Sequence, residues 1–113
     1  MSASTIRKGT YGRSIDPKLQ VVPDSSTDLT ATDTLLYSMY VSNVTGGTVS
    51  LQVLDKQSVP REVIPTTSIG PHQILSAEWL DGIVCPGGVT WVASAADSLQ
   101  AAVTGTYKVS PNS

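Results

Sequence analysis

Apolar and polar residues alternate over short stretches of this chain, the period that β-strands require. The clearest stretch is residues 34–43. One face of this predicted strand would hold Leu35, Tyr37, Met39 and Val41. The opposite face would hold Leu36, Ser38, Tyr40 and Ser42. We therefore expect a strand with one face in the core and the other towards solvent or a partner.

A second alternating stretch, residues 48–54, follows after Gly46 and Gly47. Two alternating stretches around a Gly-Gly pair are typical of a β-hairpin. The sequence therefore predicts that 34–43 and 48–54 pair with each other.

The rest of the chain also consists of short apolar or alternating stretches, separated by turn residues about every ten positions. Further strands are expected at 19–22, 63–64, 68–69, 73–79, 89–94 and 99–109, and loops at 24–33 and 80–88. In the last strand we expect Ala101, Val103, Gly105 and Tyr107 on the inner face. No stretch has a helical period. The predicted fold is all-β: a small antiparallel β-sandwich or jelly-roll-like barrel with an extended N-terminal arm.

Charge divides the chain into two parts. Residues 1–18 hold four basic residues and one acid, whereas the remaining 95 hold three basic and eight acidic residues, for an overall net charge of −2. The first part also has few apolar residues, so burial cannot offset the entropy of ordering it alone. We predict a basic arm at 1–18 that becomes ordered against a partner, and a single β-sandwich domain at 19–113. The partner-binding residues of the arm would be Arg7, Lys8, Tyr11, Arg13 and Lys18.

Composition limits the class of ligand and the compartment in which the protein is made. A net negative charge disfavours nucleic acid as the main ligand, because phosphate binding needs a basic surface. No stretch approaches the ~20 apolar residues of a membrane span. Cys85 is the only cysteine, and no apolar run follows the early basic residues. We therefore expect synthesis in a reducing cytoplasm, no membrane partner and no disulfide within the chain.

A search for catalytic groups finds isolated residues. His72, the only histidine, follows Pro71 in a predicted turn, and Cys85 precedes Pro86. A Cys85–His72 pair would need a positive environment to form the thiolate, but the nearby charges are Glu78 and Asp81. We interpret Cys85 as a small core residue and His72 as an exposed turn residue. The protein is predicted not to be an enzyme.

The candidate metal-binding and modification residues are also interpreted as structural. Asp24, Asp28 and Asp33 lie in an oxygen-rich loop that calcium would tolerate, but their spacing differs from that of an EF-hand. Such residues also supply turn hydrogen bonds. Asn43-Val44-Thr45 matches a glycosylation sequon, which we interpret as the start of a turn. We predict no metal and no cofactor.

Aromatic and apolar residues suggest binding surfaces. Trp79 and Trp91 follow strand alternation beside apolar neighbours, which favours the core for both. Tyr40 is the aromatic residue of the domain expected to be exposed. If copies of the chain assemble, with a trimer favoured, their interface would contain Leu36, Tyr40, Ile83 and Val84.

The segments 36–45, 49–57 and 86–94, with the turn at 68–71, resemble small β-sandwich virion proteins of tailed bacteriophages. This resemblance covers roughly residues 34–107. It implies a capsid decoration or cement protein, in which a compact β-domain lies on the capsid surface and an extended arm reaches neighbouring subunits. The major capsid protein would be its partner.

Two functions from different classes follow. The first is a non-enzymatic virion protein that binds and stabilises the capsid lattice. The alternative is a carbohydrate- or surface-binding β-sandwich module, including a phage tail, neck or fibre component.

Overall fold

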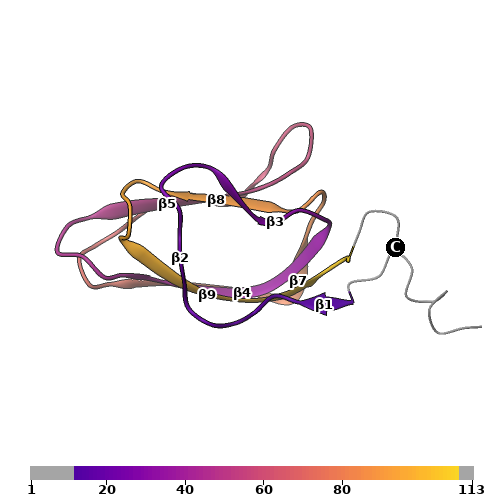
Figure 1. Cartoon of the computed structure of the whole chain (residues 1–113), viewed down its shortest axis with the longest axis horizontal. Coiled ribbons are helices and arrows are strands. Elements are labelled where there is room, and N and C mark those ends of the chain that lie inside the picture. Colours follow the sequence, from indigo (N-terminus) through magenta and orange to yellow (C-terminus); the bar gives the residue numbers. More distant parts are fainter. Residues whose placement is uncertain (1–11, 110–113) are drawn as a thin grey trace, which may run out of the picture.

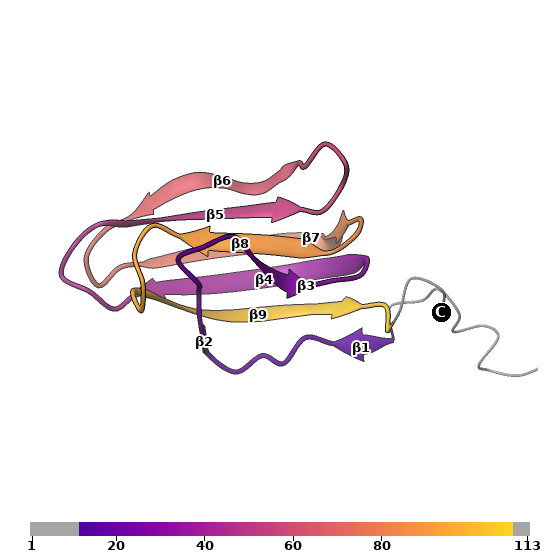
Figure 2. The same cartoon turned by 45° about the horizontal axis from the view of Figure 1, so that its top comes forward.

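The computed structural model describes residues 12–109, which form two antiparallel β-sheets packed face to face. This confirms the all-β prediction and its sandwich form. Figure 1 shows the two layers edge-on, and Figure 2 shows the strand order within them. Sheet A has the order β1-β9-β4-β7, with β2 also paired to β9, and sheet B has the order β3-β8-β5-β6.

The strands of sheet A come from both ends and the middle of the chain. They are β1 (Arg13–Ser14), β2 (Gln20–Val21), β4 (Thr34–Asn43), β7 (Ile74–Cys85) and β9 (Leu99–Tyr107). Those of sheet B are β3 (Thr27–Thr30), β5 (Val49–Asp55), β6 (Glu62–Ile69) and β8 (Val89–Ala93). After β3, only β5 and β6 follow one another within one sheet; every other connection crosses between the layers.

The core fills the space between the sheets, and both contribute fully buried side chains. Met39, Val41 and Val103 come from sheet A, and Leu51 and Val53 come from sheet B. Val89, Trp91 and Ala93 of β8 are buried together, as their alternation predicts. In β9, Ala101, Val103 and Gly105 are buried and Tyr107 is half-buried. Period-two alternation therefore located the inner faces of β8 and β9 correctly.

The predicted hairpin between 34–43 and 48–54 is wrong. The two strands exist, as β4 and β5, but β4 pairs with β7 and β9 while β5 pairs with β6 and β8. Gly46 and Gly47 are not among the glycines with positive φ, which a two-residue hairpin turn requires. The 44–48 segment instead carries the chain from one sheet to the other.

A buried amide fixes this crossover. Asn43 Nδ2 donates to the carbonyl oxygens of Gly47 at 2.7 Å and Ile69 at 2.9 Å. Asn43 Oδ1 accepts from the Thr45 backbone N–H at 2.9 Å and from the Thr45 hydroxyl at 2.7 Å. Asn43 thus ties two sheet-to-sheet connections together, and its sequon belongs to a turn.

The N-terminal boundary differs from the prediction. Arg13 and Ser14 pair with Tyr107 and Thr106 of β9, and Ile15 is buried with its N–H donating to Gly105 O at 2.9 Å. Residues 13–15 therefore belong to sheet A rather than to an arm outside the domain. Apolar burial of Ile15 explains the attachment. Arg7, Lys8 and Tyr11 lie outside the described residues.

Two predicted loops contain strand. Residues 27–30 of the expected 24–33 loop form β3 and pair with β8. The expected 80–88 loop is largely the second half of β7, which continues to Cys85. The separate short pieces at 63–64 and 68–69 are one strand, β6, at the edge of sheet B.

Candidate functional surface on sheet A

The exposed large hydrophobic side chains of the described strands all belong to sheet A. They are Val21 of β2, Tyr37 and Tyr40 of β4, and Ile74, Leu80 and Val84 of β7. Within the described chain, the remaining ones lie between or after strands: Leu19, Val44, Val59 and Val109. Exposed apolar residues that gather on one surface are typical of a binding site.

The centre of this surface is a shallow hollow of about 450 Å³ where β4 and β7 lie side by side. It is lined by Tyr37, Ser38, Tyr40, Glu78, Trp79 and Leu80. Tyr37 and Tyr40 are 41% and 44% exposed, whereas Trp79 is half-buried and also packs against the core. The hollow thus combines three aromatic rings with one carboxylate.

A hydrogen bond orders the two strands across the hollow. The Tyr40 hydroxyl donates to Glu78 Oε1 at 3.0 Å. This bond and the negative charge of Glu78 raise the pKa of Tyr40, because ionised tyrosine would lose the bond and face a second anion. Below that pKa, Tyr40 presents a neutral ring with its hydroxyl directed at Glu78.

Leu80 reaches solvent because β7 bulges. Ser38 pairs with Glu78, yet Leu36, two residues earlier in β4, pairs with Ile83, five residues later in β7. The extra residues of β7 leave the ladder between Glu78 and Ile83, and Leu80 is 97% exposed. Gly82 closes the bulge at φ +81, where a Cβ would also lie 2.8 Å from Leu35 Cδ1.

The same bulge changes which residues of β4 point into the core. Met39 and Val41 point inwards as expected, but Leu36 is fully buried and Leu35 and Tyr37 are not. The expected outward orientation of Leu36 is therefore wrong, because the register shift between Leu36 and Ser38 breaks the alternation.

The other predicted interface residues lie on sheet A. Tyr40 and Val84 are 44% and 48% exposed, and Ile83 is half-buried against the core. Leu36 offers no surface to a partner. Sequence reasoning missed Tyr37, which it placed on the inner face of β4. It also missed Ile74 and Leu80, because residues 74–85, one continuous strand, were predicted as a strand and a loop. Of the predicted arm residues that the structure describes, Arg13 lies in β1, and Lys18 is exposed with Nζ 3.8 Å from Asp16.

Cys85 and His72 do not meet. They flank opposite ends of β7, so they lie on the order of 35 Å apart along an extended strand. Cys85 is fully buried, and burial raises the pKa of its thiol to about 11. His72 is exposed in the turn before β7, with φ at 56°. The pair cannot act as nucleophile and base.

Two of the three candidate calcium ligands, Asp28 and Asp33, form ion pairs instead. Asp28 accepts from Lys56 at 2.7 Å, and Asp33 accepts from the Gly87 N–H at 2.7 Å and from Lys108 at 3.2 Å. The Gly87 bond and then Lys108 lower the pKa of Asp33. Between residues 12 and 109, no three His, Cys, Asp or Glu side chains are grouped as metal ligands.

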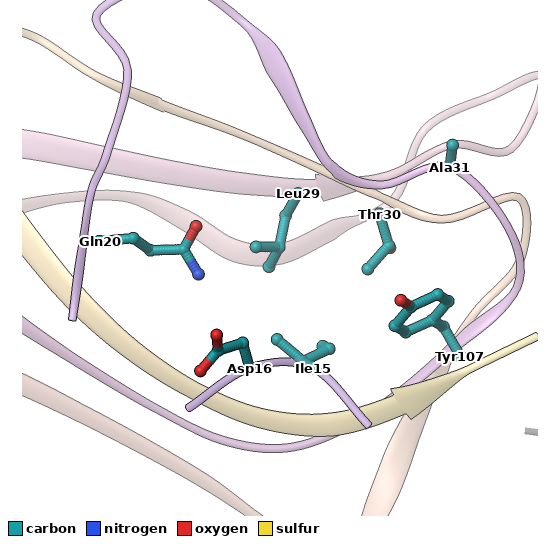
Figure 3. Close-up of a pocket in the computed structure, with 7 residues that line it drawn as sticks. All are labelled: Ile15, Asp16, Gln20, Leu29, Thr30, Ala31 and Tyr107. Atoms are coloured by element: carbon teal, nitrogen blue, oxygen red, sulfur yellow. The ribbon is translucent and has the colours of Figure 1, made fainter. Parts of the chain in front are cut away.

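A second hollow lies where the N-terminal segment, β3 and the end of β9 meet (Figure 3). It measures about 340 Å³ and is lined by Ile15, Asp16, Gln20, Leu29, Thr30, Ala31 and Tyr107. In Figure 3, Ile15, Leu29, Thr30 and Tyr107 lie around the hollow, whereas the Ala31 side chain points away from it. None of the apolar residues that line it is among the exposed large hydrophobic side chains.

No protein-family model, curated protein or solved structure matches this chain. Among residues 12–109, no helix is long and apolar enough to span a membrane.

Proposed function

We propose that this protein is a non-enzymatic virion component: a capsid decoration or cement protein that binds the major capsid protein lattice of a tailed phage. In this proposal it is made in the host cytoplasm and resides on the capsid surface. The observation that carries the binding role is the apolar outer surface of sheet A, centred on Tyr37 and Tyr40. Protein interfaces favour such aromatic residues.

The chemistry of the described residues also favours binding over catalysis. The buried Cys85 thiol has a pKa of about 11, and His72 lies at the far end of β7. The resemblance of 34–107 to small phage virion proteins supplies the class of partner. The basic sequence of residues 1–18 supplies a segment that can contact a neighbouring acidic protein.

The first experiment is quantitative peptide mass spectrometry of particles purified from the source of the protein. Copies in the hundreds per particle support decoration. About a dozen copies would move the protein to the neck, tail or fibre, and the absence of the protein would overturn the virion proposal.

The second experiment measures attachment to source capsids from which the protein has been stripped. Tyr40→Ala should weaken binding about tenfold or more, because aromatic anchors dominate interfaces. The matched control is Val59→Ala, a side chain that is 82% exposed in the connection between β5 and β6. Equal binding by both variants would contradict the role of the Tyr40 surface.

Removal of residues 1–11 tests the arm separately. This deletion retains β1 and the buried Ile15, whereas a deletion to residue 18 would remove both. The shortened protein should keep its fold and lose capsid attachment. Full attachment by the shortened protein would exclude the arm as a binding segment.

The hollow favours a second candidate function, a carbohydrate-binding module. Tyr37, Tyr40 and Trp79 are rings on which sugars can stack, and Glu78 and Ser38 provide polar partners. Titration with a panel of glycans, followed by tryptophan fluorescence, tests this function. A response that Tyr40→Ala abolishes would support it, and no response to any glycan would count against it.

A further inference from the structure

The two lateral edges of sheet A differ in charge. One edge is β7, which carries Glu78 and Asp81 and, beyond them at Val84, is contacted by the Arg61 guanidinium. The other is the N-terminal edge, residues 13–21 alongside β9, which carries Arg13 and Lys18 with one acid, Asp16. An acidic edge and a basic edge therefore lie on opposite sides of the same sheet.

Both edges also expose apolar side chains. Ile74, Leu80 and Val84 of β7 are 67%, 97% and 48% exposed. On the N-terminal edge, Leu19 and Val21 are 62% and 48% exposed. None of the large hydrophobic side chains on the described edge strands of sheet B, β3 and β6, is comparably exposed. Charge and apolar area thus coincide at the two edges of sheet A.

The backbone of β7 offers a third form of complementarity. The Asn43 N–H donates to Gln73 O at 2.9 Å, so the backbone N–H and C=O groups of Gln73 are directed towards β4. In an antiparallel ladder, the hydrogen-bonding direction of the backbone alternates from residue to residue. The backbone groups of Leu75 and Ala77 therefore also point towards β4. Those of Ile74, Ser76 and Glu78 point away from it. This first half of β7 is an open edge for strand addition. At Val84, Arg61 Nη2 donates to the carbonyl oxygen at 2.5 Å.

We propose that the β7 edge of one copy binds the N-terminal edge of a second copy, giving a head-to-tail contact. A symmetric contact between two β7 edges would instead oppose Glu78 and Asp81 to their own copies, which like-charge repulsion disfavours. Unlike edges generate a closed ring when the rotation closes and an open filament when it does not.

The exposed apolar area limits how strong such a contact can be. The exposed fractions of Ile74, Leu80, Val84, Leu19 and Val21 together equal about three whole side chains, or roughly 500 Å² of apolar surface. Interfaces are a little over half apolar, so the full contact would bury about 900 Å². That is just under the ~1,000 Å² minimum for a specific interface, so we expect a weak, concentration-dependent contact. This inference does not depend on capsid binding, because it concerns the isolated protein.

Charge reversal tests the proposal, with the oligomeric state measured by native mass spectrometry and sedimentation velocity. The full-length protein should assemble in a concentration-dependent manner. Glu78→Lys with Asp81→Lys should raise the dissociation constant at least tenfold, and so should Arg13→Glu with Lys18→Glu. The variant with all four changes should assemble again, because each reversed edge then meets its reversed partner.

The matched control is Asp24→Lys compared with Asp81→Lys, since both replace an exposed aspartate and change the net charge equally. Asp24→Lys should leave the oligomer intact. Circular dichroism confirms that each variant is folded before its assembly is interpreted.

Three results would overturn the proposal. The first is a monomeric full-length protein at about 100 µM, a concentration well above the micromolar range of weak specific contacts. The second is assembly that is lost on reversal of β7 but kept on reversal of Arg13 and Lys18, which indicates a β7-to-β7 contact. The third is failure of the four-change variant to assemble while it remains folded.

Discussion

Sheet A and sheet B supply the core alike but present different chemistry to solvent. Leu36 in sheet A and Leu51 in sheet B are both fully buried. On the outer faces, sheet A exposes Tyr37, Tyr40 and Leu80, whereas sheet B presents Ser50, Gln52 and Thr66 around a small hollow. Fold stability needs only the inner faces. Sheet B folds without an apolar outer surface, so folding does not explain the one on sheet A. We therefore assign the outer surface of sheet A to binding.

Leucine-to-alanine substitutions give the largest test of this comparison. Leu36→Ala and Leu51→Ala should each lower the free energy of unfolding by about 3 kcal/mol, because each leaves a cavity in the core. Leu80→Ala should cost less than about 0.5 kcal/mol, because its side chain is already in water. Urea unfolding measures all three. A large loss at Leu80 would mean that the bulge of β7 is part of the folded core.

The connection between the sheets gives the next largest effect. Asn43→Ala should destabilise the protein by about 2–3 kcal/mol, because the carbonyl groups of Gly47 and Ile69 lose their donor. Gln52→Ala, on the outer face of β5, is the matched amide control and should cost little. If the two amide substitutions cost the same, the crossover would be held by other contacts.

Acid should weaken the sheet B side at the end of β5, where the Asp55 carboxylate is buried. Burial of the Asp55 carboxylate disfavours its charge, but hydrogen bonds from Arg61 N–H and Gln57, with the Arg61 charge, outweigh this, and its pKa is lowered. Such a group stabilises the fold above its unfolded pKa of about 3.9, and the stabilisation is lost as the pH falls through the folded value. Asp55→Asn should cost about 2 kcal/mol at pH 7, because hydrogen bonds to a charged group are lost.

The difference between wild type and Asp55→Asn should shrink on acidification below about pH 4, because protonation removes the same charge. Thermal unfolding of both proteins at pH 7 and pH 3 measures this change. A constant difference would show that Asp55 acts through packing rather than through its charge.

The smallest effect belongs to sheet A at alkaline pH. Glu78→Gln should lower the pKa of Tyr40 towards the ordinary tyrosine value of about 10, since both the carboxylate hydrogen bond and the charge are removed. Ultraviolet titration of the tyrosines reports the change. The contact is complete below pH 10 and is lost as the pH rises through the raised value. An unchanged titration curve would mean that Tyr40 and Glu78 do not interact in solution.

The sequence alone determined the all-β class and several strands closely: 34–43 is β4, and β8 and β9 end within two residues of the prediction. It also located the buried faces of β8 and β9, the core position of Trp91 and Cys85, and the exposure of Tyr40. These properties are local, because alternation and turn residues act over a few neighbours.

Only the tertiary structure decided which strands pair and which residues reach the surface. Gly46 and Gly47 lie in a connection between the two sheets rather than in a hairpin turn. The Asn43 side chain holds this connection by a hydrogen bond to the carbonyl of Ile69, a distant residue in the chain. Leu36 is buried and Leu80 exposed because β7 carries extra residues opposite Leu36–Ser38 of β4. A register shift is a property of two strands together, so the pattern within either strand cannot reveal it.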